Sequence, residues 1–298
     1  MPFVSIRGVD HYYEWISTSP ITEPFVPSKP VMVFVHGWGG SDRYWESTAH
    51  ALVDEFDCLL YDMRGFGRSR LPNPISPEVS AIGYELVTYA DDLALLLDAL
   101  SIQRIYINGH STGASIVALF LNRYGDRVER AILTCNGIFE YDKNAFEAFY
   151  KFGRYVVMFR PPWLAKIPFI DRIFMARFLH RPIAAKDRRE FLEDFLLADF
   201  DAALGTIFTA VSKEAVEFMP KEFAQLTVPT LLISGEYDQI IPADMGQKAA
   251  ALNSQTIEYH VIPGTSHFPM LEDASAYLKL VRQFLGLAPA TVASGNSV

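Results

Sequence analysis

The stretch Ile105-Tyr106-Ile107-Asn108-Gly109-His110-Ser111-Thr112-Gly113-Ala114 decides how the rest of this sequence is interpreted. A short apolar run of β type ends at Gly109, and an apolar pattern of helical period begins after Gly113. Glycines two residues before and after Ser111 let the chain reverse so sharply that the serine takes a strained conformation with its side chain outward. This G-x-S-x-G spacing between a strand and a helix is that of a nucleophile elbow. The alternative is a turn in which Ser111 only caps the helix.

Length and composition bound the class of protein. The chain has 298 residues, half of them hydrophobic, which is enough for a sizeable core. Its net charge of −9 argues against a nucleic acid partner, because nucleic acids select basic surfaces. The seven histidines show no metal-ligand spacing, and Cys58 and Cys135 lie far apart in apolar runs. We therefore expect core cysteines, with no disulfide and no metal site.

We expect no secretory signal in the first ten residues. Residues 1–10 lack a basic start followed by an apolar run, and no uninterrupted apolar run reaches the length of a membrane-spanning helix. These features predict a cytoplasmic protein that is at most peripheral to a membrane. Residues 288–298 are small and polar and are expected to be disordered.

Apolar runs of β type alternate with segments of helical period on both sides of the elbow. This alternation predicts an α/β fold, with a mostly parallel central sheet, helices on both faces and ligands bound at the carboxyl ends of the strands. A hairpin of strands 3–6 and 12–16, joined at residues 8–10, precedes it. The expected sheet strands are 31–35, 58–61, 105–107, 130–134, 230–234 and 256–262; the expected helices are 44–55, 88–100, 245–252 and 274–284.

Residues 139–223 interrupt the alternation. They contain no run of β type, several prolines punctuate them, and they are rich in aromatic side chains. We predict that they form a helical cap inserted into a core domain made of residues 1–138 and 224–287.

An activated serine needs a base to take its proton and an acid to orient that base. In the order serine, acid, histidine, Asp238 follows the next-to-last predicted strand and His267 follows the last one. Both positions bring a side chain to the edge of the sheet where Ser111 is expected. Either residue alone could be an ordinary loop residue, but order and position agree for both. Glu236 and Asp244 are rival acids.

Two backbone N–H groups are needed to bind the oxyanion of a tetrahedral intermediate. We expect one from Thr112, directly after the serine, and the other from Trp38 in the glycine-rich loop 36–40. A phosphate-binding turn is the alternative for this loop, but neither G-x-G-x-x-G nor a P-loop lysine is present. His110 is expected to pack or hydrogen-bond structurally.

Together these motifs resemble the α/β-hydrolase fold superfamily over nearly the whole chain. The resemblance implies a triad of Ser111, Asp238 and His267 that requires no metal or organic cofactor. Dehalogenases and epoxide hydrolases of this superfamily would have aspartate in place of the serine. The S-T-G and D-x-R-G-F-G-R-S motifs also resemble cofactor-free haloperoxidases and perhydrolases. The motifs are H-G-W-G-G (36–40), D-M-R-G-F-G-R-S (62–69), G-H-S-T-G (109–113), G-E-Y-D-Q-I-I-P (235–242) and G-T-S-H-F-P (264–269).

The resemblance implies a serine hydrolase, of carboxylesterase or lipase type, that cleaves an ester of an apolar small molecule or lipid through an acyl-enzyme. A thioesterase, a C–C bond hydrolase, an acyltransferase or a perhydrolase would use the same triad, and a small-molecule receptor is the non-enzymatic alternative. In such enzymes the cap shapes the pocket, so its aromatic residues imply a lipophilic substrate, although each could equally pack against its neighbours. The candidate pocket residues are His110, Phe139, Phe146 and Phe268. The sequence predicts neither acyl chain length nor oligomeric state.

Many cations lie between Lys143 and Arg189, although the chain is acidic overall. Apolar residues are interleaved with them, as in amphipathic faces at membrane interfaces. We hypothesise that the cap docks on an anionic membrane surface. The simpler alternative is a solvated basic face over packed helices.

Overall fold

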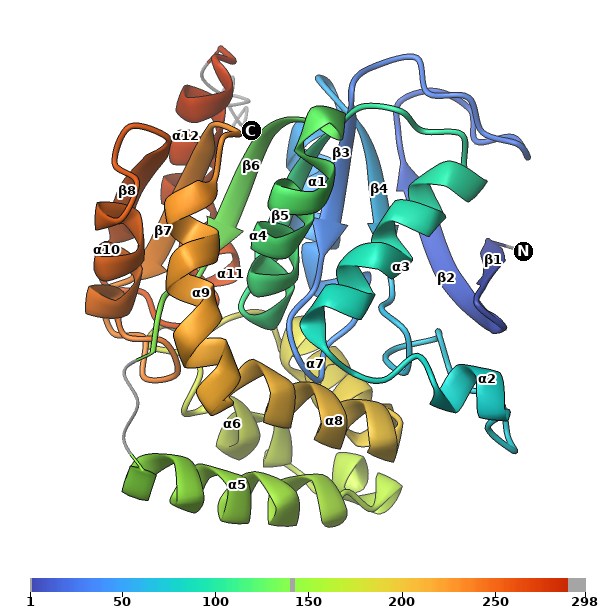
Figure 1. Cartoon of the computed structure of the whole chain (residues 1–298), viewed down its shortest axis with the longest axis vertical. Helices are drawn as coiled ribbons and strands as arrows, with labels where there is room; N and C mark the ends of the chain where they lie inside the picture. Colours follow the sequence, from blue (N-terminus) through green and yellow to red (C-terminus); the bar gives the residue numbers. More distant parts are fainter. Residues whose placement is uncertain (1, 140–142, 289–298) are drawn as a thin grey trace, which may run out of the picture.

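An eight-stranded sheet runs through the molecule in the order β1-β2-β4-β3-β5-β6-β7-β8 (Figure 1). β2 pairs antiparallel with β1 and β4, and all other neighbours are parallel, so the predicted α/β fold with a mostly parallel sheet is confirmed. The computed structural model describes residues 2–139 and 143–288, without the side chains of residues 143–149 and 152. The strands are β1 (Phe3–Ile6), β2 (Val9–Ile16), β3 (Val31–Val35), β4 (Asp57–Tyr61), β5 (Ile105–His110), β6 (Val128–Thr134), β7 (Thr230–Gly235) and β8 (Ile257–Ile262).

Helices cover both faces of the sheet because alternate side chains of each central strand point to opposite faces. In β3, Val31, Val33 and Val35 face the layer of α3, α4, α9 and α10, whereas Met32 and Phe34 face α1 and α12. All five residues of β3 are buried, as expected for a strand inside a parallel sheet. The helices outside the insert are η1 (Asp42–Trp45), α1 (Glu46–Leu52), α2 (Pro77–Ser80), α3 (Leu86–Ala99), α4 (Thr112–Tyr124), η2 (Gly125–Arg127), α10 (Ala243–Ala251), α11 (Pro269–Glu272) and α12 (Ala274–Leu285).

Two elements begin or end at other residues than predicted, because a turn or a capping hydrogen bond sets their boundary and the hydropathy pattern does not. The first turn lies at Arg7 and Gly8, both with positive φ, so Val9 already pairs with Ile6 and the second strand begins earlier than predicted. The predicted helix 44–55 instead begins with the 3₁₀ turn η1, where the Ser41 side chain accepts a hydrogen bond from the N–H of Arg43. It ends at residue 52 as α1.

A helical insert lies between β6 and β7, as predicted, and its described residues contain no strand. Its last helix, α9, packs Met219 and Phe223 into the core of the sheet domain. The cap boundaries 139–223 stay a prediction, and the predicted tail lies outside the described residues except for Ala288. The elements of the insert are α5 (Lys143–Met158), η3 (Pro162–Lys166), α6 (Ile170–Met175), α7 (Ala185–Leu197), α8 (Phe200–Ala210) and α9 (Lys213–Gln225).

No helix within residues 2–139 and 143–288 is both long enough and apolar enough to span a bilayer.

A buried histidine makes the stability of the fold depend on pH. His11 on β2 is almost fully buried; its Nδ1 donates to the carbonyl of Val9 at 3.1 Å, and its Nε2 has no hydrogen-bond partner among the residues that the structure describes. Burial lowers the pKa of His11 and outweighs the attraction of the nearby Asp92 carboxylate. Between this lowered pKa and about 6.5, the unfolded chain binds a proton that the folded chain does not, so the free energy of unfolding rises with pH.

We therefore expect His11→Leu to flatten this dependence by up to about 1.4 kcal/mol per pH unit below pH 6.5. Urea unfolding at a series of pH values measures the slope. The same substitution at the exposed His50 is the matched control. An unchanged slope in His11→Leu would show that His11 is charged in the folded protein.

Candidate active site

The chain reverses at Ser111, between the end of β5 and the start of α4. Ser111 has φ +54° and ψ −122°, a conformation that side-chain-bearing residues rarely adopt. The two flanking glycines are required by close contact. A Cβ on Gly113 would lie 2.3 Å from the carbonyl oxygen of His36, and one on Gly109 would lie 2.7 Å from a methyl group of Val117. The predicted sequence of strand, sharp turn and helix is therefore present.

Three strand ends bring Ser111, His267 and Asp238 together. The Ser111 hydroxyl lies 3.0 Å from Nε2 of His267, and Nδ1 of His267 lies 2.7 Å from Oδ2 of Asp238. The other carboxylate oxygen, Oδ1, accepts hydrogen bonds from the N–H groups of Ile240 (2.8 Å) and Ile241 (3.0 Å). Burial alone would raise the pKa of Asp238, but His267 and these N–H donors outweigh it and lower that pKa. The carboxylate is therefore ionised and oriented at neutral pH.

The two rival acids do not reach His267. Glu236 accepts the N–H of Gly264 at 2.8 Å and is exposed. Asp244 pairs with Lys248 on the surface of α10. Both carboxylates are engaged away from the histidine, and Asp238 is the acid that contacts it.

The glycine-rich loop after β3 lies directly beside Ser111. A Cβ on Gly37 would lie 3.2 Å from the Cβ of Ser111. Among the residues that the structure describes, the backbone N–H groups of Trp38 and Thr112 have no hydrogen-bond partner. The indole of Trp38 donates to the carbonyl of Ala203 in α8 at 2.8 Å, which anchors the loop to the insert. The geometry leaves both predicted donors available.

The predicted pocket residues are in different surroundings. His110 is buried; its Nε2 donates to the carbonyl of His267 (2.7 Å) and its Nδ1 lies 3.0 Å from the Tyr44 hydroxyl, the structural packing expected of it. The Phe268 ring packs 4.7 Å from the His110 ring and is also buried. Phe139 is half-buried, and the side chain of Phe146 lies outside the described residues. Their contact with a substrate stays a prediction.

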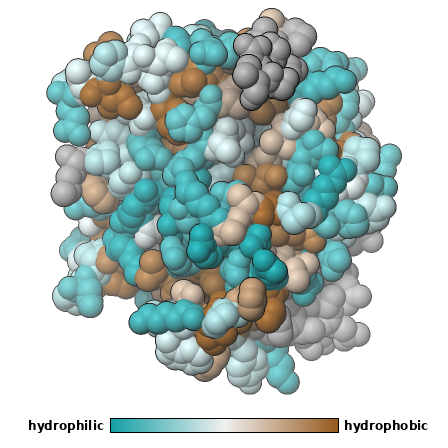
Figure 2. Space-filling model, turned by 180° about the vertical axis from the view of Figure 1, so that it is seen from behind, coloured by the Kyte–Doolittle hydropathy of each residue, from teal (hydrophilic) through white to brown (hydrophobic). Residues whose placement is uncertain are grey.

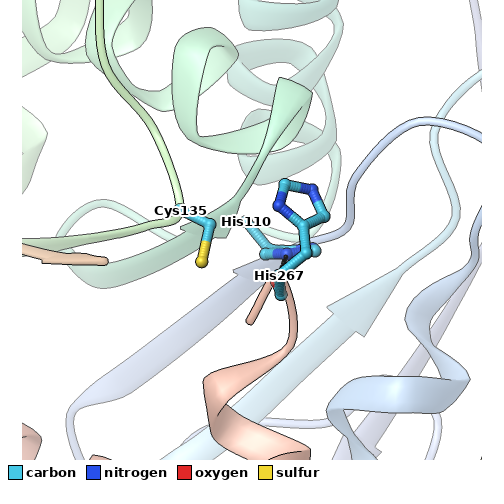
Figure 3. A group of neighbouring side chains, drawn as sticks. All are labelled: His110, Cys135 and His267. Carbon is cyan, nitrogen blue, oxygen red and sulfur yellow. Dashed lines mark hydrogen bonds between the residues drawn. The ribbon is translucent and has the colours of Figure 1, made fainter. Parts of the chain in front are cut away.

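Cys135 lies beside the two histidines, with its sulfur within 4.8 Å of a nitrogen of each (Figure 3). Soft metals bind such groups, but all four ring nitrogens of His110 and His267 already have hydrogen-bond partners. Burial raises the pKa of the Cys135 thiol well above its usual value, so it stays protonated. We assign no metal site to this cluster. Cys58 and Cys135 are both buried, as predicted for core residues.

Two phenylalanines of the insert lie next to the site and were not singled out by the sequence. The Phe178 ring lies 6.1 Å from the His267 ring, and its carbonyl accepts the His267 N–H at 2.9 Å. The Phe195 ring lies 5.5 Å from Trp38. Phe174 contacts Phe195 at 4.8 Å and continues the aromatic layer. Composition indicated an aromatic cap, but no spacing pattern identifies which rings face the triad.

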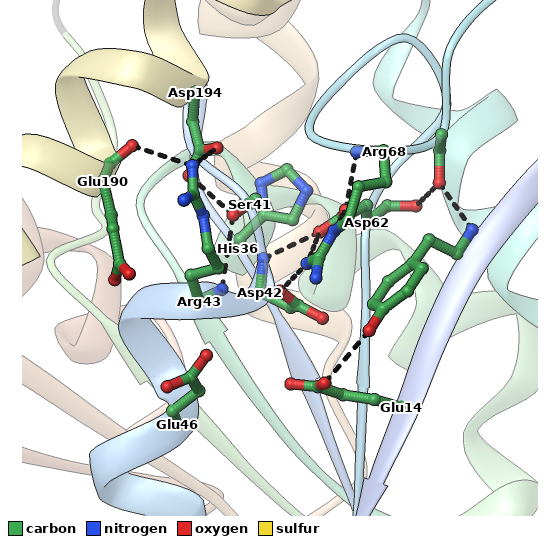
Figure 4. A network of polar contacts seen from close by, with 12 residues as sticks. Glu14, His36, Ser41, Asp42, Arg43, Glu46, Asp62, Arg68, Glu190 and Asp194 are labelled. Carbon is green, nitrogen blue, oxygen red and sulfur yellow. Dashed lines mark hydrogen bonds and ion pairs between the residues drawn. The ribbon is translucent and has the colours of Figure 1, made fainter. Parts of the chain in front are cut away.

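A buried carboxylate joins the insert to the same glycine-rich loop (Figure 4). Asp194 of α7 accepts a hydrogen bond from the Ser41 hydroxyl at 2.6 Å and pairs with Arg43. Burial raises the pKa of Asp194, although Arg43 opposes the shift. The position of the loop that carries Trp38 is thus coupled to the position of α7.

A second polar cluster holds the start of η1 and the loop after β4 (Figure 4). Oδ1 of Asp62 accepts the N–H of Asp42 at 2.9 Å, and its Oδ2 accepts both the N–H and the Nε of Arg68 at 2.7 Å. Arg68 also pairs with Asp42. Both carboxylates are completely buried, and burial, together with the charge of Asp62, raises the pKa of Asp42. Arg68 is thus the cation that balances two buried negative groups.

We expect Arg68→Ala to lower the free energy of unfolding by about 3 kcal/mol, because it leaves buried carboxylates without their cation. The loss should be smaller at about pH 5 than at about pH 8, since a carboxyl group with a raised pKa is protonated at lower pH. Urea unfolding at both pH values measures it. Adding Asp42→Asn should restore part of the stability. Equal stability of Arg68→Ala and the parent would contradict this account.

Comparison with known proteins defines the class. A family model described as alpha/beta hydrolase fold matches residues 30–274. The chain therefore belongs to the alpha/beta hydrolase fold family.

Individual relatives are distant but cover nearly the whole chain. The chain is 26% identical over 281 residues to a non-heme haloperoxidase of Rhodococcus erythropolis, covering 90% of this chain and 93% of that one. It is 24% identical over 299 residues to a non-heme chloroperoxidase of Kitasatospora aureofaciens, covering 90% and 92%. An esterase from Exiguobacterium antarcticum superposes with a TM-score of 0.75 at 18% identity, over 95% of this chain and 98% of that one. At that identity the likeness shows the fold alone.

Proposed function

We propose that this protein is a serine hydrolase that cleaves a carboxylic ester of an apolar small molecule or lipid. The observation that carries the proposal is the pair of hydrogen bonds from Ser111 to His267 and from His267 to Asp238. The Ser111 hydroxyl attacks the ester carbonyl while Nε2 of His267 takes its proton. The tetrahedral intermediate collapses, its C–O bond to the alcohol breaks, and His267 gives the proton to the departing alcohol.

The second half of the reaction frees the enzyme. His267 removes a proton from water, the resulting hydroxide attacks the acyl group on Ser111, and the acid leaves as the serine regains its proton. Asp238 stays ionised throughout and holds the imidazole in the tautomer whose Nε2 can accept a proton. The N–H groups of Trp38 and Thr112 bind the oxyanion in both halves.

The aromatic layer of the insert supports an apolar substrate. Phe178 and Phe195 lie beside His267 and Trp38, so an acyl or alcohol group bound between nucleophile and insert would contact rings. His110, Phe139, Phe146 and Phe268 remain predicted pocket residues.

Perhydrolysis is the second candidate reaction. Two relatives, at 24% and 26% identity, are named as a non-heme chloroperoxidase and a non-heme haloperoxidase. In perhydrolysis, hydrogen peroxide would replace water as the group that attacks the acyl-enzyme, and a peracid would leave. Ser111, His267 and Asp238 would keep the roles given above.

The test is labelling with a fluorophosphonate probe, followed by rates on p-nitrophenyl esters of increasing acyl length with and without hydrogen peroxide. We expect stoichiometric labelling and a rate optimum at medium or long acyl chains. A rate of peracid formation higher than the rate of acid release would favour perhydrolysis. If the protein takes no label, both candidate reactions are overturned and a small-molecule receptor on this fold is favoured.

A further inference from the structure

The outer part of the insert, residues 151–177, has an unusual surface. These 27 residues carry seven of the seventeen exposed large hydrophobic side chains found among the described residues. Ile173 is 72% exposed, Phe159 67% and Phe169 64%. In Figure 1, α5 forms the edge of the molecule farthest from the sheet, and Figure 2 shows hydrophobic residues interspersed with hydrophilic ones over this lower end. We call residues 151–177 the distal segment.

The part of the insert that contains the distal segment differs in net charge from the rest of the chain. Residues 143–189 contain eleven Lys and Arg against three Asp and Glu, a net charge of +8, whereas the remaining residues contain fifteen against thirty-two, a net charge of −17. The one acid of the distal segment, Asp171, pairs with Arg188 at 2.9 Å. Five of its cations have no carboxylate partner among the described side chains: Lys151, Arg154, Lys166, Arg172 and Arg177.

Two hollows open between these cations. One, of about 600 Å³, is lined by Lys151 and Arg154 together with Tyr150, Tyr155 and other apolar groups. The other, of about 360 Å³, is lined by Lys166, Arg172, Arg188 and Arg189, by the carboxylates of Asp171 and Glu193 and by apolar groups that include Phe169. The guanidinium of Arg172 also lies 5.2 Å from the Phe169 ring centre. Aromatic and aliphatic groups are thus placed next to positive charge.

We propose that the distal segment docks on the surface of a bilayer that contains anionic phospholipids. Exposed aromatic rings lie favourably at the level of lipid headgroups, and unpaired Lys and Arg are attracted to anionic headgroups. A free anion would explain the cations but not the exposed Phe159, Phe169 and Ile173. A second copy of the chain would bring two equally positive surfaces together across a symmetric contact, which like charges oppose.

The inner side of the same segment packs against the aromatic residues that lie beside the candidate active site. Phe174 packs against Phe178 and Phe195, and Phe178 approaches the His267 ring, while the neighbouring Ile173 is exposed. Docking at the distal segment would therefore place the aromatic layer over the triad close to the lipid phase. The docking proposal goes beyond the reaction and does not depend on it.

The experiment is co-sedimentation of Ser111→Ala protein, which turns over no lipid, with sucrose-loaded vesicles. We expect binding to phosphatidylcholine vesicles that contain phosphatidylglycerol, little binding to phosphatidylcholine alone, and weaker binding at high salt. Lys166→Glu with Arg172→Glu should lower the partition coefficient by at least about tenfold. The matched control is Lys221→Glu with Lys279→Glu, which makes the same charge change on exposed residues of α9 and α12.

Phe159→Ser with Phe169→Ser tests the apolar part at unchanged net charge, and it should also weaken binding to the anionic vesicles. These exposed residues lie outside the triad, so hydrolysis of a short soluble ester reports whether each variant, made with Ser111 intact, is folded. The docking proposal is overturned if the parent binds no anionic vesicles. It is also overturned if Lys166→Glu with Arg172→Glu lowers the partition coefficient no more than Lys221→Glu with Lys279→Glu does. It is also overturned if sedimentation equilibrium shows a dimer of the parent that the variant Phe159→Ser with Phe169→Ser does not form. Vesicle binding without esterase activity would overturn only the proposed function.

Discussion

Ser111→Ala is expected to lower kcat on a p-nitrophenyl ester by about 10⁶-fold, the loss seen when a triad nucleophile is removed. Alanine keeps the Cβ and can occupy the same positive-φ turn, so the elbow between β5 and α4 should persist. The variant lacks only the hydroxyl that lies 3.0 Å from Nε2 of His267. Labelling by the fluorophosphonate probe should disappear together with the rate.

Ser115→Ala is the matched control, because Ser115 lies one turn further along α4. Its hydroxyl accepts a hydrogen bond from the Asn136 side chain at 2.8 Å, whereas the side-chain hydrogen bonds of His267 within the described part of the chain go to Ser111 and Asp238. We expect this variant to keep kcat within a few fold and to take the label fully. A Ser111→Ala protein that still takes the label would place the reactive nucleophile elsewhere.

The parts of the fold that were predictable depend on local chemistry. The role of the glycines around Ser111 could be predicted because a sharp turn leaves no room for side chains. The structure confirms this, since a Cβ added to Gly109 or Gly113 would collide with neighbouring atoms. Asp238 and His267 could be predicted because each lies in the loop that follows a predicted strand, β7 or β8, and parallel strands end at one edge of the sheet. The arrangement of Ser111, Asp238 and His267 could therefore be predicted from residue type and position in the chain.

The parts that were missed depend on contacts between distant segments. Asp194 lies more than 150 residues from Ser41, and nothing in the helical pattern of α7 identifies its buried carboxylate as a partner of the glycine-rich loop. Helical periodicity shows that one face is buried, but not against what. The same holds for Phe178 beside His267 and for Tyr44, whose hydroxyl lies 3.0 Å from Nδ1 of His110.

Asp238→Asn is expected to lower kcat by about 10⁴-fold while leaving the fold intact. The reason lies in the two oxygens of Asp238. Oδ1 accepts N–H groups from Ile240 and Ile241, so the oxygen of an asparagine amide would stay on that side. The amide nitrogen would then face Nδ1 of His267 and donate to it. This places the imidazole proton on Nε2, which can no longer accept the proton of Ser111.

Rates and labelling of the single and double variants test this coupling. If both residues act on one proton transfer, Asp238→Asn should add almost nothing to the loss in Ser111→Ala, because members of one catalytic unit are strongly non-additive. Urea unfolding should show that Asp238→Asn remains folded, which separates a lost tautomer from a lost structure. Full activity of Asp238→Asn would mean that the carboxylate 2.7 Å from His267 does not orient the base.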